Sequence, residues 1–145
     1  MKVVVQRCDK ANVSVNNQIV GSINKGLMLL VGFTQGDNST NIDYLVDKII
    51  NLRIFDDESG IMNKSLIDIN GSILSISQFT LYSDTTRGRR PSYIKALSGD
   101  LAIKLYDEFN QKLKAKGIHT ETGIFGAEMK VDFINDGPIT IILEK

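Results

Sequence analysis

The sequence predicts an α+β fold, a single domain of mainly antiparallel β-sheet with two main helices. Two segments, about residues 40–53 and 100–116, carry apolar residues at helical spacing. Most other apolar residues alternate with polar ones, as they do in β-strands, and turn residues separate these stretches. No linker, repeat or low-complexity segment divides the 145 residues, so one domain spanning residues 1–145 is expected.

Some eight segments alternate or run apolar as strands do. The fourth is almost continuously apolar, which is typical of a buried central strand. Asn16-Asn17 is a turn that joins the second and third strands into a hairpin. In chain order the expected strands are residues 2–8, 12–15, 18–23, 27–33, 72–82, 118–122, 128–134 and 139–143.

Both predicted helices have recognisable ends. Asn38 or Ser39 can cap the first helix with a side-chain oxygen. The acidic stretch of residues 56–60 breaks that helix into a loop. Gly117 ends the second helix, because glycine readily adopts the left-handed conformation that follows a helix C-terminus.

Gly137-Pro138 lies between the last two predicted strands. Pro138 fixes its own φ and has no N–H, whereas Gly137 has no Cβ and reaches backbone angles closed to other residues. An X-Pro bond is also the only peptide bond for which the cis form is accessible, at about 0.5–1 kcal/mol above trans. Such a dipeptide can present a rigid backbone wedge, but taken alone the motif favours a plain turn between strands.

The composition is that of a globular protein with 42% apolar and 23% charged residues. No stretch approaches the ~20 apolar residues of a membrane span, and the N-terminus alternates as a strand and lacks a signal-peptide core. A single cysteine, Cys8, excludes an internal disulfide and fits a reducing compartment. We therefore expect a cytoplasmic protein without a membrane partner.

Charge is balanced overall but locally clustered. A net charge of zero argues against a protein that coats DNA or RNA non-specifically, because such binding requires neutralisation of many phosphates. No DNA partner is expected. The basic residues gather in two segments and fit a partner that touches one face of the protein better than a partner that wraps around it. They are Arg87, Arg89, Arg90 and Lys95 in the first segment, and Lys112, Lys114 and Lys116 in the second.

Groups for acid–base, nucleophilic or metal chemistry are scarce. His119 is the only histidine and is expected to be structural or exposed. The acids at residues 56–58 are consecutive, so their side chains diverge, and no further ligand completes a metal site. We expect no metal and no cofactor. Thr80 is a candidate nucleophile, but its hydroxyl needs a neighbouring base and the sequence shows none; a role for its backbone is favoured.

Two separated motifs carry a resemblance to a known family. They are residues 77–81 (SQFTL) and residues 135–140 (NDGPIT). Together they resemble the paired signatures of the D-aminoacyl-tRNA deacylases, also known as D-tyrosyl-tRNA deacylases, with Ile139 where valine is commoner. Further stretches stand in the family's order: residues 53–55 (RIF), 62–66 (MNKSL), 87–92 (RGRRPS) and 122–129 (TGIFGAEM).

The resemblance implies the family's barrel-like fold and an editing hydrolase that cleaves the ester of D-aminoacyl-tRNA. An aminoacyl ester is already activated, so orientation and a few backbone donors suffice, with help from the tRNA 2′-hydroxyl. By the same resemblance the catalytic segment consists of Ser77, Gln78, Phe79 and Thr80.

The remaining site residues follow from the same resemblance. Gly137-Pro138 would be cis and would enter the site of the other subunit of a homodimer, where it excludes L side chains. Glycine has no side chain, so glycyl-tRNA, such as mischarged tRNA-Ala, would also be cleaved. Arg7 would hold the Gly-Pro loop. The pocket for the terminal adenosine would be lined by Phe125, Gly126, Ala127 and Met129.

Two other functions remain open on the sequence. One is a non-catalytic module that binds tRNA ends, and the other is an esterase or amidase with a serine or threonine nucleophile. Replacing Thr80 separates the two enzyme hypotheses, because only a nucleophile enzyme would lose all activity.

Overall fold

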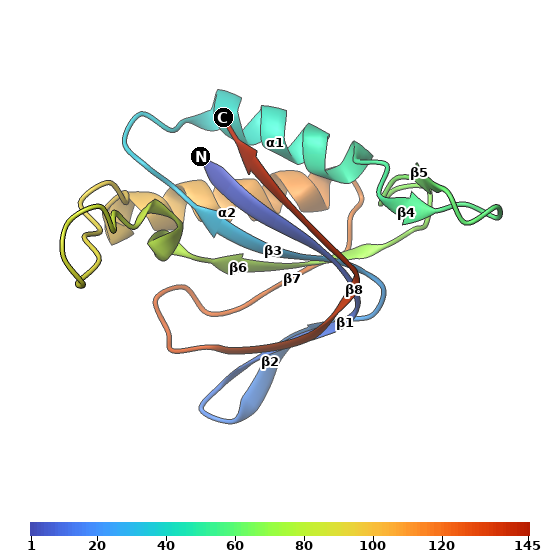
Figure 1. Cartoon of the computed structure of the whole chain (residues 1–145), viewed down its shortest axis with the longest axis horizontal. Helices are drawn as coiled ribbons and strands as arrows, with labels where there is room; N and C mark the ends of the chain where they lie inside the picture. Colours follow the sequence, from blue (N-terminus) through green and yellow to red (C-terminus); the bar gives the residue numbers. More distant parts are fainter.

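The computed structural model describes residues 1–145 and shows two helices on one face of a strongly curved sheet (Figure 1). The helices are α1 (Ser39–Asn51) and α2 (Gly99–Ala115), with a short 3-10 helix η1 (Phe79–Tyr82). The strands are β1 (Lys2–Val15), β2 (Gln18–Ile23), β3 (Gly26–Gly32), β4 (Phe55–Asp56), β5 (Met62–Lys64), β6 (Ser72–Ser77), β7 (Thr120–Thr122) and β8 (Lys130–Glu144). No helix is both long and apolar enough to span a membrane.

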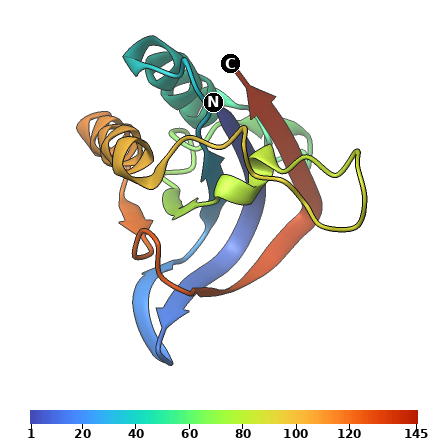
Figure 2. The same ribbon diagram turned by 90° about the vertical axis from the view of Figure 1, so that its left-hand side faces the viewer.

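The main sheet has the order β2-β1-β3-β6-β7, and β8 pairs with β1 in addition. The long strand β1 pairs antiparallel with β3 through its first half, with β2 through its second half, and with β8 along most of its length. The pairs β3-β6 and β6-β7 are parallel. Each parallel step needs a crossover, and these crossovers contain α1 and α2. The predicted α+β fold, mainly antiparallel and barrel-like, is confirmed, and Figure 2 shows how far the sheet curls.

Several local predictions are confirmed. Asn16 and Asn17 have φ values of 50° and 63°, as a two-residue hairpin turn of the primed type requires. Asn38 caps α1 by accepting a hydrogen bond from the Thr40 N–H at 2.9 Å. Gly117 follows α2 with φ 82°.

Three expectations about strands are wrong. The strands predicted at 2–8 and 12–15 are one continuous strand, β1. The strand predicted over 72–82 ends at Ser77, and the chain turns into η1, although the alternation of apolar residues continues. The strands predicted at 128–134 and 139–143 are one strand, β8, which accommodates the Gly-Pro step by shifts in register against β1. The short pair β4-β5, which flanks the acidic turn, is not among the predicted strands, because it has too few residues to show a period.

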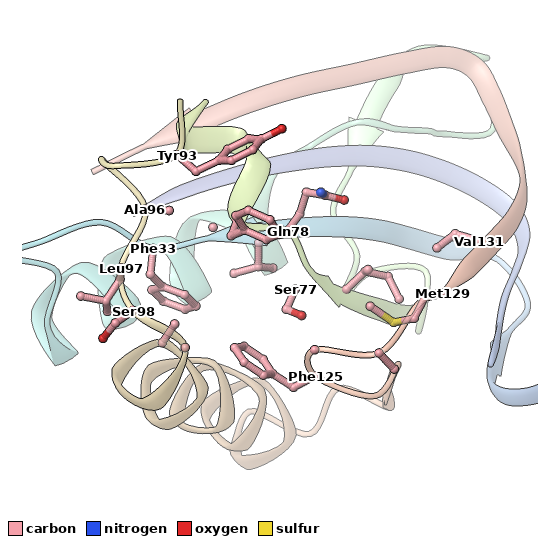
Figure 3. Close-up of a pocket in the computed structure, with 18 residues that line it drawn as sticks. Phe33, Ser77, Gln78, Tyr93, Ala96, Leu97, Ser98, Phe125, Met129 and Val131 are labelled. Carbon is pink, nitrogen blue, oxygen red and sulfur yellow. The ribbon is translucent and has the colours of Figure 1, made fainter. Parts of the chain in front are cut away.

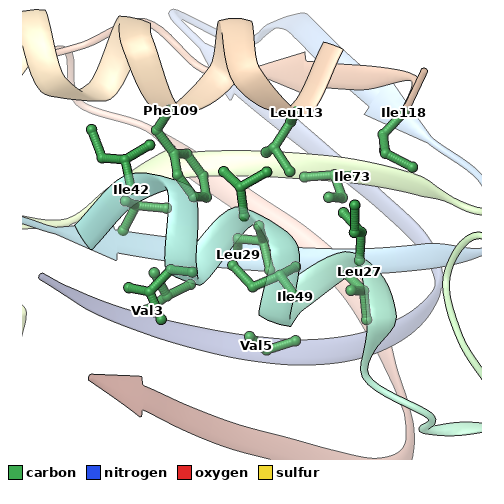
Figure 4. Close-up of a cluster of buried hydrophobic side chains, with 14 of the residues drawn as sticks. Val3, Val5, Leu27, Leu29, Ile42, Ile49, Ile73, Phe109, Leu113 and Ile118 are labelled. Carbon is green, nitrogen blue, oxygen red and sulfur yellow. The ribbon is translucent and has the colours of Figure 1, made fainter. Parts of the chain in front are cut away.

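The core lies mainly between the helices and the sheet (Figure 4). Apolar residues from α1 and α2 meet those of β1, β3 and β6; fully buried members include Val3, Leu29, Ile42, Ile49, Ile73 and Phe109. A smaller cluster around Met28, Leu74 and Ile76 covers the opposite face. There Met129 and Val131 are only partly buried, so this side of the sheet stays partly open.

Candidate functional site

The sheet, the start of α2 and two loops enclose a cavity of about 650 Å³ (Figure 3). Twelve of its 18 lining residues are hydrophobic, and the volume falls in the range of small-molecule and cofactor sites. The lining residues fall within 31–33, 76–79, 93–102 and 125–131. The cavity is therefore suited to a small molecule, or to part of a larger one, with a largely apolar surface.

The end of β6 brings Ser77, Gln78 and Phe79 to this cavity. The Gln78 N–H donates to the Val31 carbonyl at 2.7 Å, which fixes the junction between β6 and η1 against β3. The first N–H groups of a helical turn have no partner inside it. The main-chain N–H groups of Phe79 and Thr80, at the start of η1, donate in none of the turn and loop hydrogen bonds of the chain. These donors can face an oxygen that gains negative charge during a reaction.

Tyr106 of α2 supports two walls of the cavity from behind. Its hydroxyl donates to the Ser75 carbonyl at 2.7 Å, two residues before the cavity wall at Ser77. Its ring packs against that of Phe125, with centroids 5.8 Å apart. Burial raises the pKa of Tyr106, so the hydroxyl keeps its proton and stays a donor. One buried side chain thus ties β6 to the segment that precedes β8.

Thr80 lacks the surroundings of a nucleophile. Its hydroxyl accepts a hydrogen bond from the Gln78 side-chain amide, which is not a base. His119, the only histidine, is 64% exposed, pairs with Glu121 at 3.3 Å and does not line the cavity. The geometry favours a role for the Thr80 backbone over one for its hydroxyl.

The Gly137-Pro138 peptide bond is cis, and both residues are exposed. Arg7, only 6% exposed, holds the preceding residue: its Nε lies 2.9 Å from the Asp136 carboxylate and donates to the Asp136 carbonyl at 3.3 Å. The other end of the guanidinium donates to the Ile54 carbonyl at 2.8 Å. The turn is therefore fixed to β1 and to the segment after α1 by charge-assisted hydrogen bonds.

Most of the residues expected at the site meet at the cavity. Those that line it are Ser77, Gln78, Phe79, Phe125, Gly126, Ala127 and Met129. Thr80, Arg7, Gly137 and Pro138 do not line it. Sequence reasoning missed four lining residues: Phe33 just after β3, Tyr93 and Leu97 in the loop before α2, and Ala102 in α2. No group of three or more His, Cys, Asp or Glu side chains is placed to hold a metal ion.

Comparison with known proteins decides the family. Residues 4–144 match the family model described as D-Tyr-tRNA(Tyr) deacylase. The chain belongs to this family. A D-aminoacyl-tRNA deacylase of Limosilactobacillus reuteri is 56% identical over all 145 residues, covering 100% of both chains. One from Bacillus cereus strain B4264 is 54% identical over 144 residues, covering 99% of both.

Solved structures agree on the fold of the deacylase. A protein titled c-Myc DNA Unwinding Element Binding Protein superposes with a TM-score of 0.94 at 38% identity, over 100% of this chain and 99% of the other. A probable eukaryotic D-amino acid tRNA deacylase superposes with a TM-score of 0.83 at 20% identity, over 98% and 97% of the two chains. The expectation that the chain is an enzyme of the D-aminoacyl-tRNA deacylase family, a hydrolase, is confirmed.

Proposed function

We propose that the cavity binds the aminoacyl-adenosine end of a D-aminoacyl-tRNA and hydrolyses its ester without a protein nucleophile. The observation that carries this proposal is the junction of β6 and η1, where Gln78 and Phe79 line a largely apolar cavity. The N–H groups of Phe79 and Thr80 there take part in none of the turn and loop hydrogen bonds. Within hydrogen-bonding reach of the Thr80 hydroxyl there is an amide, and no carboxylate or imidazole.

The proposed reaction uses the substrate's own hydroxyl. Water attacks the ester carbonyl carbon, and the N–H groups of Phe79 and Thr80 stabilise the negative charge that develops on the carbonyl oxygen. The bond to the ribose 3′-oxygen then breaks. The neighbouring 2′-hydroxyl orients the water, accepts a proton from it and passes its own proton to the leaving 3′-oxygen, so the products are the free D-amino acid and tRNA with both ribose hydroxyls restored.

The wall formed by Phe125, Gly126, Ala127 and Met129 takes the terminal adenosine in this proposal. Phe125 offers a ring against which a base can stack, and Tyr106 holds that ring from behind. Gly126 has φ 76° and an open surrounding, so the backbone there can approach a ligand closely.

Chiral selection is assigned to Gly137-Pro138 of a second copy. The turn is exposed and well anchored but lies outside the cavity of its own chain. Entering the cavity of a partner, it would fill the space that an L side chain needs and leave room for a D side chain or for glycine. The active form is then a homodimer. Sedimentation at micromolar concentration should show a dimer, and a fully active monomer would contradict this assignment.

Hydrolysis of D-Tyr-tRNA beside L-Tyr-tRNA by the purified protein tests the proposed function. We expect release of D-tyrosine, an L-ester that is spared, and a rate unchanged by exhaustive chelation. Cleavage of both esters at similar rates would contradict the proposal, as would a loss of activity on chelation that zinc restores. A protein that binds the tRNA end without cleaving either ester would be a binding module instead.

A further inference from the structure

Two exposed aromatic rings lie at the rim of the cavity. Phe79 of η1 and Tyr93 of the loop before α2 meet edge to face, with centroids 5.1 Å apart and an angle of 69° between the rings. Phe79 is 56% exposed and Tyr93 is 41% exposed. Figure 3 places Tyr93 on the side of the cavity opposite Phe125. Two large rings left this open beside a ligand site indicate a surface that a ligand covers.

The backbone around Tyr93 is ordered by four hydrogen bonds. Asp84 and Ser92 exchange a pair of main-chain bonds at 2.7 and 2.9 Å, immediately before Tyr93. The Ala96 N–H then donates to the Tyr93 carbonyl at 2.9 Å, and the Thr34 hydroxyl donates to the Lys95 carbonyl at 2.6 Å. The ring is therefore presented from a fixed position beside the end of β3, which lowers the entropy cost of binding against it.

The loop between Asp84 and Ser92, just before Tyr93, carries three arginines without an acidic partner. Arg87, Arg89 and Arg90 are exposed and form no ion pair, and the loop projects from the body of the protein (Figure 2). Asp84 is already engaged: Lys95 lies 3.2 Å from its carboxylate, and Thr86 donates to it through its N–H and its hydroxyl. These hydrogen bonds lower the pKa of Asp84 to about 2, so the carboxylate is ionised at neutral pH. Its negative charge is already paired with Lys95 and not with an arginine.

Open rings beside unpaired arginines match the chemistry of single-stranded nucleic acid, which stacks its bases on aromatic side chains and pairs its phosphates with cations. We infer that Phe79 and Tyr93 form a stacking platform for the nucleotide that precedes the terminal adenosine of the RNA substrate. Arg87, Arg89 and Arg90 hold the phosphates next to that nucleotide. This inference rests on the proposed function, in which the terminal nucleoside occupies the side of the cavity at Phe125. The next nucleotide must then leave across the rim.

The second basic segment does not share this surface. Lys112 is engaged by Asp43, Glu108 and Ser39. Lys114 and Lys116 lie at the far end of α2, about 22 Å along the helix from Gly99 at the cavity, at 1.5 Å per residue. These lysines supply a matched control for the arginines.

Binding of a short RNA tests the platform without relying on catalysis. The probe is a labelled single-stranded RNA that ends in CCA, compared with the same RNA made abasic at the penultimate position. We expect Tyr93→Ala to weaken binding of the intact RNA about tenfold, Tyr93→Phe to retain it, and Tyr93→Ala to have no effect on the abasic RNA. The control Tyr44→Ala removes a tyrosine of similar exposure on α1 and should change nothing.

The salt dependence tests the arginines separately. Each phosphate neutralised on a single strand contributes about 0.7 to the slope of log K against log salt, so replacing all three arginines by glutamine should lower the slope by about 2. Replacing Lys112, Lys114 and Lys116 by glutamine should leave it unchanged.

Each result bears on one claim. Equal losses for intact and abasic RNA on Tyr93→Ala would overturn the platform. Equal slopes for the two triple variants would overturn the role of the arginines. Tight, Tyr93-dependent RNA binding by a protein that hydrolyses no D-aminoacyl-tRNA would overturn the proposed function and leave the platform standing.

Discussion

Replacing Gly32, which ends β3 and lines the cavity, with alanine would press on the backbone of the catalytic segment. A Cβ at Gly32 would lie 2.9 Å from the Gln78 carbonyl oxygen and 3.2 Å from the Leu81 Cβ. The first distance is shorter than real Cβ contacts allow, and the obstructing atom is backbone rather than the end of a flexible side chain. The junction between β6 and η1 must therefore move away from β3, and Phe79 moves with it.

Two effects of this substitution can be estimated. Extra atoms in a packed interior cost about 1–3 kcal/mol, and removing a strand glycine returns about 0.5–1 kcal/mol. The free energy of unfolding should therefore fall by about 1–2 kcal/mol. The effect on catalysis is larger, because a misplacement of about 1 Å at a reacting centre can cost about 100-fold. We expect kcat/KM for D-Tyr-tRNA to fall by about 10- to 100-fold.

Gly71→Ala is the matched control for this experiment. Its Cβ would lie 2.6 Å from the Leu66 Cδ1 and 2.9 Å from the Ile69 Cδ1, so it also crowds the interior, but at the start of β6 and against side-chain ends. Urea unfolding and D-Tyr-tRNA hydrolysis of both variants are the required assays. Gly71→Ala should lose stability only. Wild-type kcat/KM in a folded Gly32→Ala protein would refute the argument that the β6-η1 backbone sets the rate.

Three further predictions concern single side chains. Thr80→Val should keep kcat within about tenfold of wild type, because the hydroxyl contacts only the Gln78 amide; a loss beyond about 1000-fold in single-turnover assays would identify a nucleophile. Tyr106→Phe removes the donor to the buried Ser75 carbonyl, and urea unfolding should show a loss of about 1–3 kcal/mol, whereas an unchanged stability would mean that water replaces the hydroxyl. Burial raises the pKa of the Cys8 thiol from 9.0 to about 11. The neutral thiol's contribution to stability is therefore complete below pH 9 and is lost as pH rises to about 11. The stability difference between wild type and Cys8→Ala should shrink by up to about 3 kcal/mol over that range, and a constant difference would contradict the shift.

The elements that the sequence predicts well are those whose signals are local. Asn16-Asn17 defines a two-residue hairpin, and capping by Asn38 together with a stripe of apolar residues defines α1. The end of β6 has no such signal. The alternation of apolar residues continues past Ser77, but the Gln78 N–H takes the last ladder position at Val31, and beyond it the sheet offers no partner.

The residues of the candidate site also divide into those that a local motif predicts and those that only the tertiary structure brings to the cavity. Family motifs place Phe79 and Phe125 at one cavity, and both line it. Tyr93 and Leu97 reach the cavity because the Leu97 N–H pairs with the Phe33 carbonyl at 2.9 Å, a contact between segments 64 residues apart that no periodicity encodes. The position of Gly137 outside its own cavity depends on the path of β8 along β1, which is likewise a property of the whole sheet.

The central claim is that the protein supplies position and main-chain donors while the RNA supplies the reactive hydroxyl. The most direct measurement is the single-turnover hydrolysis of D-tyrosine esterified to tRNA that ends in adenosine or in 2′-deoxyadenosine, under saturating enzyme. The loss of a positioned proton-transfer group should slow the deoxy substrate by about 100-fold or more, with no comparable change in its affinity. Equal rates for the two substrates would contradict the account and return the search to a nucleophile on the protein.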